Sequence, residues 1–231
     1  MSLPNPIEES VPVSGWRKRL GSIQAAAMAG LVAAIGWVYA LVRLLDGPGV
    51  DATEDEIIRF YSNPDTGWDT FFVLQVLFVA TAGFLWFVGV IRGRVGIGIP
   101  KLFDTVFFGG GILLAGLMFV GSAALAAPFV LADRGAVGID PAAAAMTRSF
   151  AMVALGVYAP RIAALFVFSS STLGLRTGVL PRWLAVLGYV LGVLLLVDVT
   201  ISTPSVFVFP AWIALVSIVL VFHRNPRPHG D

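Results

Sequence analysis

The sequence contains no cysteine and few charged residues, and these two deficits narrow the class of protein. Without cysteine, the 231 residues cannot form disulfides, thiolate metal sites, a thiol nucleophile or a cysteine lipid anchor. Charged residues make up 13% of the chain, whereas soluble domains average about 25%. So few charges cannot cover a water-facing surface. The formal net charge of +1 gives no general attraction to nucleic acid, and we expect no nucleic-acid partner.

Long apolar runs fill most of the chain, which is 58% hydrophobic. Each run is about twenty residues long, the length that a helix needs to cross a bilayer. A membrane barrel would instead show alternating segments of about ten residues. The sequence therefore predicts an all-α polytopic membrane protein, a bundle of six transmembrane helices with the lipid bilayer as its main partner. The expected helices are residues 22–45, 70–91, 103–130, 142–173, 183–201 and 206–222.

Basic residues gather in alternate gaps between these runs and give the orientation. Short loops rich in Lys and Arg stay on the cytoplasmic side. We therefore expect a multi-pass protein of the cell (inner or plasma) membrane, with cytoplasmic tails at 1–19 and 225–231 around a transmembrane domain at 20–224. The basic residues on the cytoplasmic side are Arg17, Lys18, Arg19, Arg92, Arg94, Lys101, Arg176, Arg182, Arg224 and Arg227.

The longest polar gap, residues 46–69, contains a short helix of its own. Thr53 and Glu56 have the spacing of a capping box, in which each side chain bonds the backbone N–H of the other residue. Apolar residues follow between positions 57 and 61, and the segment 63–65 carries a proline that ends the helix. We expect an amphipathic helix on the outer membrane surface, in the first outer loop.

Charged residues inside the fourth and fifth runs are the sharpest functional candidates. Charges within membrane helices are costly and usually face a partner or a wet cavity. Arg148 and Asp198 fall at similar depths in two helices that should be antiparallel neighbours, so we predict an ion pair between them. This pair either orients the two helices or lines a path for a substrate or ion.

Arg161 follows Pro160 deep in the fourth run, 13 residues beyond Arg148, or about 20 Å along a helix. Pro160 removes an N–H and weakens the helix at that point. A kink beside a charge suits a transport site, but an ordinary bundle also holds bends in this way, and Arg161 could snorkel toward headgroups. The candidate partners of Arg161 are Asp104, Gln24 and Thr81.

Small residues recur at four-residue spacing on two of the helices. Ala26, Gly30 and Ala34 follow one another on the first, and Gly188 and Gly192 form a GxxxG on the fifth. Such faces allow close helix contacts. They either close the bundle or form a homodimer, and we expect the former.

No catalytic constellation, metal-ligand spacing or cofactor motif is present, so we expect no enzymatic activity, no cofactor and no metal. The favoured interpretation is a non-enzymatic accessory or structural membrane component, with another membrane protein as a partner. The alternative is a small transporter or channel for an ion or small solute. Its path would be lined by Arg148, Pro160, Arg161 and Asp198.

Three segments, 57–61, 84–92 and 173–184, give the chain a resemblance to a known family. The last contains Leu-Arg-Thr-Gly-Val-Leu-Pro-Arg-Trp, the most specific part. Over about residues 20–224 the chain resembles a family of multi-helix integral membrane proteins of high-GC bacteria, carried as a domain of unknown function. The resemblance implies a membrane bundle and brings no activity or site residues with it.

Overall fold

The computed structural model describes residues 23–49, 51–95, 101–133, 138–197 and 205–222. Within these ranges the regular structure is entirely helical, without strands. Its elements are α2 (Ile23–Leu45), α3 (Glu54–Tyr61), α4 (Pro64–Val95), α5 (Lys101–Asp133), α6 (Pro141–Val153), η1 (Ala154–Tyr158), α7 (Ala159–Thr177), α8 (Arg182–Val197) and α9 (Ser205–Phe222).

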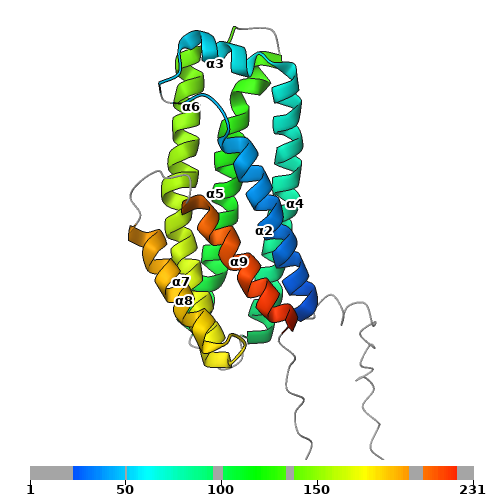
Figure 1. The fold of residues 1–231 in the computed structure, drawn as a ribbon, viewed down its shortest axis with the longest axis vertical. Helices are drawn as coiled ribbons and strands as arrows, with labels where there is room; N and C mark the ends of the chain where they lie inside the picture. The colour runs from blue at the N-terminus through cyan, green and yellow to red at the C-terminus, as the bar shows by residue number, and fades with distance from the viewer. Residues whose placement is uncertain (1–22, 50, 96–100, 134–137, 198–204, 223–231) are drawn as a thin grey trace, which may run out of the picture.

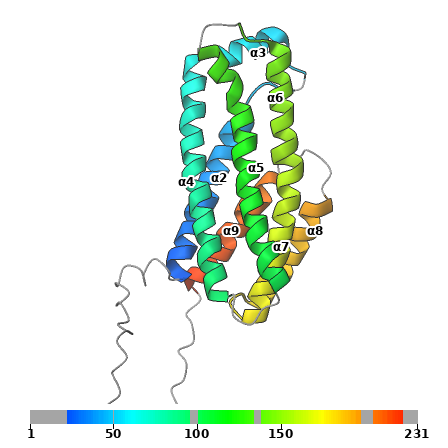
Figure 2. The same cartoon turned by 180° about the vertical axis from the view of Figure 1, so that it is seen from behind.

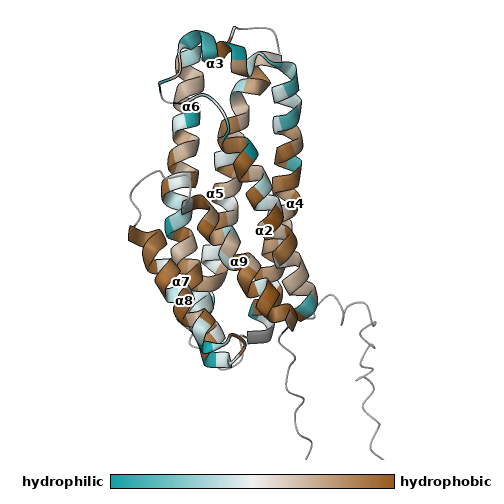
Figure 3. Cartoon of the chain, viewed as in Figure 1, coloured by the Kyte–Doolittle hydropathy of each residue, from teal (hydrophilic) through white to brown (hydrophobic). Residues whose placement is uncertain are grey.

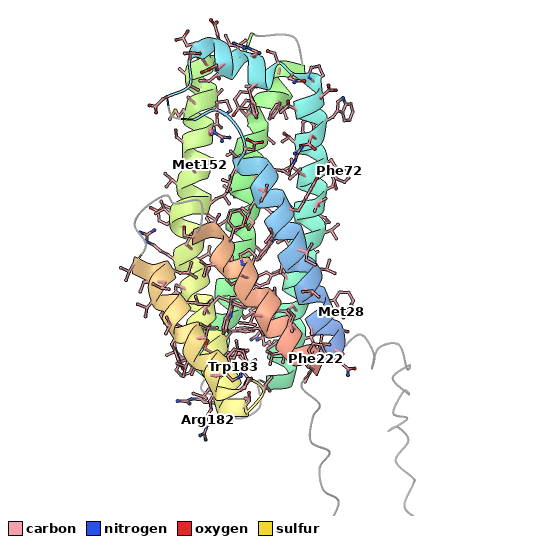
Figure 4. The ribbon with its side chains drawn as sticks, in the orientation of Figure 1. Met28, Phe72, Met152, Arg182, Trp183 and Phe222 are labelled. Atoms are coloured by element: carbon pink, nitrogen blue, oxygen red, sulfur yellow. The ribbon has the colours of Figure 1, made fainter. Side chains whose placement is uncertain are left out.

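Five stretches of helix are long and apolar enough to cross a membrane: Ile23–Leu45, Pro64–Gly93, Leu102–Ala132, Pro141–Thr177 and Ser205–Phe222. The helix α8 is also apolar but has only 16 residues. Apolar residues dominate the long helices, whereas hydrophilic residues collect on α3 (Figure 3). Large apolar side chains also cover the outside of the bundle, among them Met28, Phe72, Trp183 and Phe222 (Figure 4). This surface belongs to a membrane-type helical protein.

The long helices run side by side, and α3 lies across one end of them (Figures 1 and 2). α4, α5 and the continuous α6–η1–α7 rod extend along the length of the bundle, while α2 packs against α4 and α9, and α8 packs against α7. The start of α2 and the end of α9 lie together at the end opposite α3 (Figure 1). We call the end covered by α3 the α3 end.

Aromatic rings from several helices meet in the core. Trp37 of α2 lies 4.8 Å from Phe84 of α4 and 5.6 Å from Phe209 of α9, measured between ring centroids. Phe166 of α7 contacts both phenylalanines. The buried Trp37 indole donates a hydrogen bond of 3.0 Å to the Thr81 hydroxyl, which satisfies the one polar group of the ring. These contacts fix α2, α4, α7 and α9 against one another.

The small residues on α2 and α8 lie at helix contacts within the bundle. A Cβ on Gly30 would collide with Ser217 of α9 and lie 2.8 Å from Phe87 of α4. A Cβ on Gly188 would collide with Ser171 of α7 and lie 2.6 Å from Trp212 of α9. These glycines therefore close the bundle, as expected from their spacing.

α4 begins earlier than the apolar pattern predicts, at Pro64 instead of residue 70. The polar segment before residue 70 is helical because proline suits the first turn of a helix, where its missing N–H is not needed. The Asn63 side chain also accepts a hydrogen bond of 3.0 Å from the Asp65 N–H. Only residues 62–63 separate α3 from α4, so the chain turns sharply and α3 lies over the bundle.

Candidate functional site

The helix α3 begins with the capping box expected from Thr53 and Glu56, while its position on the outer membrane surface stays a prediction. The Thr53 N–H donates to the Glu56 carboxylate over 2.9 Å, and the Glu56 N–H donates to the Thr53 hydroxyl over 3.4 Å, completing the capping box. These hydrogen bonds lower the pKa of Glu56. On its other face, Ile57 and Tyr61 are buried with Phe129 of α5. α3 is therefore a lid that is anchored to the bundle by its apolar face.

Beneath this lid lies a cavity of about 410 Å³, which we call the polar cavity. α2, α3, α4, α5 and α6 all contribute to its walls. Its two arginines and three aspartates leave a formal charge of −1 on the lining. The polar lining residues are Arg43, Asp46, Tyr61, Asp65, Thr66, Asp69, Thr70 and Arg148.

One wall of the polar cavity is held by an ion pair between helices. Arg43, in the last turn of α2, donates to Asp69 of α4 through its Nη2 at 2.5 Å and its Nε at 3.2 Å. Both side chains remain partly exposed. The pair neutralises these two charges and leaves Arg148, Asp46 and Asp65 without an ion pair among the described residues.

Arg148 lies on the opposite wall, near the start of the α6–η1–α7 rod. Its Nη2 donates a hydrogen bond of 2.9 Å to the Leu45 carbonyl, which joins α6 to the end of α2. The guanidinium packs so closely on Gly47 that a Cβ there would lie 2.8 Å from Nη1. Asp198, the partner predicted from the sequence, lies outside the described residues, so that ion pair stays a prediction.

Tyr61 presents the most unusual polar group of the site. Its side chain is 2% exposed, and its ring packs edge-on to Phe129 at 4.8 Å. The hydroxyl is buried and makes no hydrogen bond of regular geometry among the described residues, and the Arg148 guanidinium lies beside it. Burial raises the pKa of Tyr61, and the positive charge of Arg148 and its hydrogen bond to the hydroxyl oppose that shift. A buried hydroxyl without a regular hydrogen bond costs up to about 1–3 kcal/mol.

A second, larger cavity adjoins the first at Tyr61 and Arg148. This apolar cavity has a volume of about 600 Å³ and lies between α6, the lid and the segment that connects α2 to α3. Met152 contributes to its wall and lies on α6 below α3 (Figure 4). The apolar cavity is lined by Pro48, Gly49, Ala52, Ile57, Tyr61, Ala144, Ala145, Arg148, Ser149, Met152 and Val153.

Pro160 and Arg161 lie outside these cavities, beside a widened turn of helix. η1 is a π-helical turn that directly precedes Ala159 and Pro160. Pro160 has no N–H to continue the α-helical ladder, and π-turns are one way in which helices absorb such a break. The Arg161 Nη1 donates a hydrogen bond of 2.6 Å to the Val157 carbonyl, one turn earlier. The arginine therefore binds its own helix at the disrupted turn.

None of the three partners considered for Arg161 contacts it in a recorded hydrogen bond or ion pair. Asp104 instead binds Arg92 of α4, with Nε–Oδ1 and Nη2–Oδ2 distances of 2.9 Å. Thr81 accepts from Trp37, and Gln24 is exposed. The recorded hydrogen bond of Arg161 is to the Val157 carbonyl of its own helix.

Sequence reasoning missed Arg43, Asp69 and Tyr61 as site residues. Arg43 falls at the end of the first expected helix, and Asp69 at the end of the first polar gap. The signal for Tyr61 was its four-residue spacing from Ile57 on an amphipathic helix, which requires a surface for that face to cover. The sequence does not reveal that this surface is the cavity-bearing end of the bundle.

Among the described residues, no group of three or more His, Asp or Glu side chains is arranged to hold a metal ion. The arrangement at the α3 end instead offers donors, acceptors and apolar walls to an organic ligand. The resemblance carried by residues 173–184 stays a prediction. The chain matches no known family, no curated protein and no solved structure.

Proposed function

We propose that this chain is a non-enzymatic, multi-pass protein of the cell membrane that binds a small ligand in the polar cavity on its outer side. The observation that carries the proposal is the polar cavity beneath the lid, whose lining includes Arg148, Asp46 and Asp65, three charged residues without an ion pair among the described residues. Such a protein would act as an accessory component that passes ligand occupancy to a membrane partner through its lid.

The orientation rests on charge. The end opposite α3 carries Arg92, Arg176 and Arg182 at helix ends, and short basic loops stay cytoplasmic. The polar gap that contains α3 carries half of the 14 acidic residues. In this orientation both termini are cytoplasmic, and α8 and α9 are the fifth and sixth crossings. The 16 residues of α8 extend about 24 Å, short of a hydrocarbon layer of about 30 Å.

Side-specific labelling tests this proposal, and the lack of native cysteine makes each variant a single-cysteine protein. Thr66→Cys reports on the polar cavity, and Arg182→Cys is a matched control at the opposite end. In intact cells, an impermeant maleimide should label Thr66→Cys, while Arg182→Cys should react only after permeabilisation. Reaction in the opposite order would overturn the orientation. A Thr66→Cys that reacts from neither side would exclude an open outer cavity.

Transport remains the second candidate function, because Pro160 and the π-turn lie in the middle of the α6–η1–α7 rod. π-turns occur frequently at functional sites. However, Arg161 is bound to Val157, and no described cavity is lined by Arg161. The geometry therefore favours a binding site at one end over a path through the bundle.

A further inference from the structure

The polar and apolar cavities meet at two residues, and this junction defines a ligand with two chemically distinct parts. Tyr61 and Arg148 line both cavities. A ligand that reaches both would present a polar group to the charged side and a hydrocarbon group to the other. From this juxtaposition we infer that the α3 end binds a zwitterionic amphiphile, an inference that rests on the proposed ligand site.

The head group is defined by the charges. Arg148 is a donor in the polar cavity, and its guanidinium suits a phosphate or carboxylate. Asp46 and Asp65 form no ion pair among the described residues and suit an ammonium. The formal charge of −1 on the lining disfavours a purely anionic head. A head that carries both charges can pair with Arg148 and with an aspartate.

The hydrocarbon part is defined by the second cavity. Its walls on α6 extend from Ala144 to Val153, a distance of about 13 Å along the helix. Ile57, Ala145 and Met152 give it an apolar lining. The volume of about 600 Å³ falls within the range of ligand sites, about 300–1,000 Å³. Arg148 lies within this wall, so an alkyl group that enters there has about 8 Å of it, as far as Val153, in the direction of the middle of the bundle.

The position of the site relative to the bilayer supports this choice of ligand. The 23 residues of α2 span about 34 Å, close to the thickness of the hydrocarbon layer. Arg43 and the Leu45 carbonyl that holds Arg148 belong to the last turn of α2. The polar cavity therefore lies at the level of the lipid headgroups, and the apolar cavity extends toward the hydrocarbon.

The labelling rate of Thr66→Cys in maltoside micelles measures occupancy of the polar cavity. Three probes separate the two parts of the ligand: lysophosphatidylethanolamine, glycerophosphoethanolamine without the chain, and lysophosphatidylglycerol without the ammonium. We expect the first to slow labelling at least about tenfold relative to the other two. The loss of one charge-assisted hydrogen bond predicts this difference for lysophosphatidylglycerol, and the loss of buried hydrocarbon predicts it for glycerophosphoethanolamine. Asp55→Cys, on the lid outside the cavity lining, should label at an unchanged rate.

Variants assign the effect to the two cavities. Arg148→Gln should abolish the slowing of Thr66→Cys labelling by lysophosphatidylethanolamine. Arg148→Lys should retain part of it, because lysine keeps the positive charge. Met152→Trp should fill the apolar cavity, so that lysophosphatidylethanolamine slows labelling no more than glycerophosphoethanolamine does. Its matched control is Met146→Trp on the same helix, where the side chain is 77% exposed and lines neither cavity. If lysophosphatidylethanolamine still slows the labelling of Thr66→Cys in the Met152→Trp background, its alkyl group does not occupy the apolar cavity.

The outcomes also separate this inference from the proposed function. If glycerophosphoethanolamine slows labelling as much as lysophosphatidylethanolamine does, the ligand needs no hydrocarbon part. The inference of an amphiphile would then be wrong, and a site for a polar ligand would remain. Equal protection by lysophosphatidylglycerol would overturn the zwitterionic head, and rapid labelling with all probes would overturn the inference as a whole. Repeating the assay in nanodiscs of diacyl phosphatidylethanolamine distinguishes the sources: protection there identifies a bilayer lipid, and its absence identifies a free single-chain amphiphile. Only an unreactive Thr66→Cys would contradict the outer cavity itself.

Discussion

Replacing Gly188 with alanine tests how tightly the last helices of the bundle pack. The added Cβ would collide with Ser171 and lie 2.6 and 2.9 Å from two carbons of Trp212. The serine side chain can rotate away, but Trp212 is 1% exposed and has no free space into which to move. Overpacking of this kind costs about 1–3 kcal/mol.

The helix propensity of alanine acts in the opposite direction. Exchanging glycine for alanine within a helix stabilises it by about 1 kcal/mol. Gly89 of α4 provides the matched control, because it is exposed and a Cβ there would meet nothing within 4 Å. Both variants gain the same propensity, so the difference between them isolates the packing cost. Gly188→Ala should be less stable than Gly89→Ala by about 1–3 kcal/mol.

Reversible unfolding in mixed micelles, followed by tryptophan fluorescence, measures this difference. The expected order of stability is Gly89→Ala, wild type, then Gly188→Ala. Equal effects of the two substitutions would mean that α8 does not pack against Trp212 and Ser171 as the structure describes. The close contact of Gly30 with Ser217 and Phe87 would then also be in doubt.

Three further substitutions test the lid and the opposite end. Tyr61→Phe should raise the unfolding temperature of the ligand-free protein, because it removes a buried hydroxyl without a regular hydrogen bond that costs up to about 1–3 kcal/mol. A lower unfolding temperature would contradict this cost. Because hydrogen bonds from Thr53 lower the pKa of Glu56 below its ordinary 4.5, the contribution of this carboxylate to α3 is present above that value. It is lost as the pH falls through the lower folded pKa. Amide exchange of α3, corrected for intrinsic rates, should therefore accelerate in this acid range in the wild type but not in Glu56→Gln; identical pH profiles would refute the role of the cap. Arg92→Lys should destabilise the protein almost as much as Arg92→Gln, because an ammonium cannot bridge both oxygens of Asp104 or stack on Phe108 as the guanidinium does. Wild-type melting of the lysine variant would argue against that geometry.

Local patterns predict much of this fold because each depends on residues close in sequence. Thr53 and Glu56 form the capping box that their three-residue spacing predicts. Gly30 and Gly188 lie where helices contact each other. Apolar run length predicts six crossings; among the described residues five helices have membrane length, and the sixth, α8, is shorter. The start of α4 was misjudged because an Asn63 cap and a proline in the first turn extend the helix through polar residues.

The candidate site depends on tertiary placement and was only partly predictable. Arg148 stood out because a charge near a membrane span needs a partner, yet the partner recorded in the structure is a backbone carbonyl at Leu45. Every residue has a backbone carbonyl, so a sequence does not show which carbonyl will accept a hydrogen bond. This holds for Leu45 and also for Val157, which accepts from Arg161. The cavities themselves arise where α3 crosses the bundle, an angle set by the two residues between α3 and α4.

We propose that this protein holds a ligand site at one end of the bundle, and that no water-filled path passes Arg161 in the part of the chain that the structure describes. Cysteine accessibility at Arg161 tests the claim most directly, with Thr66→Cys as the positive control. Small impermeant methanethiosulfonate reagents are applied to each side of reconstituted membranes. The account predicts that Thr66→Cys reacts from the outer side and that Arg161→Cys reacts from neither side. Reaction of Arg161→Cys from either side would contradict the account and make transport through the bundle the better explanation.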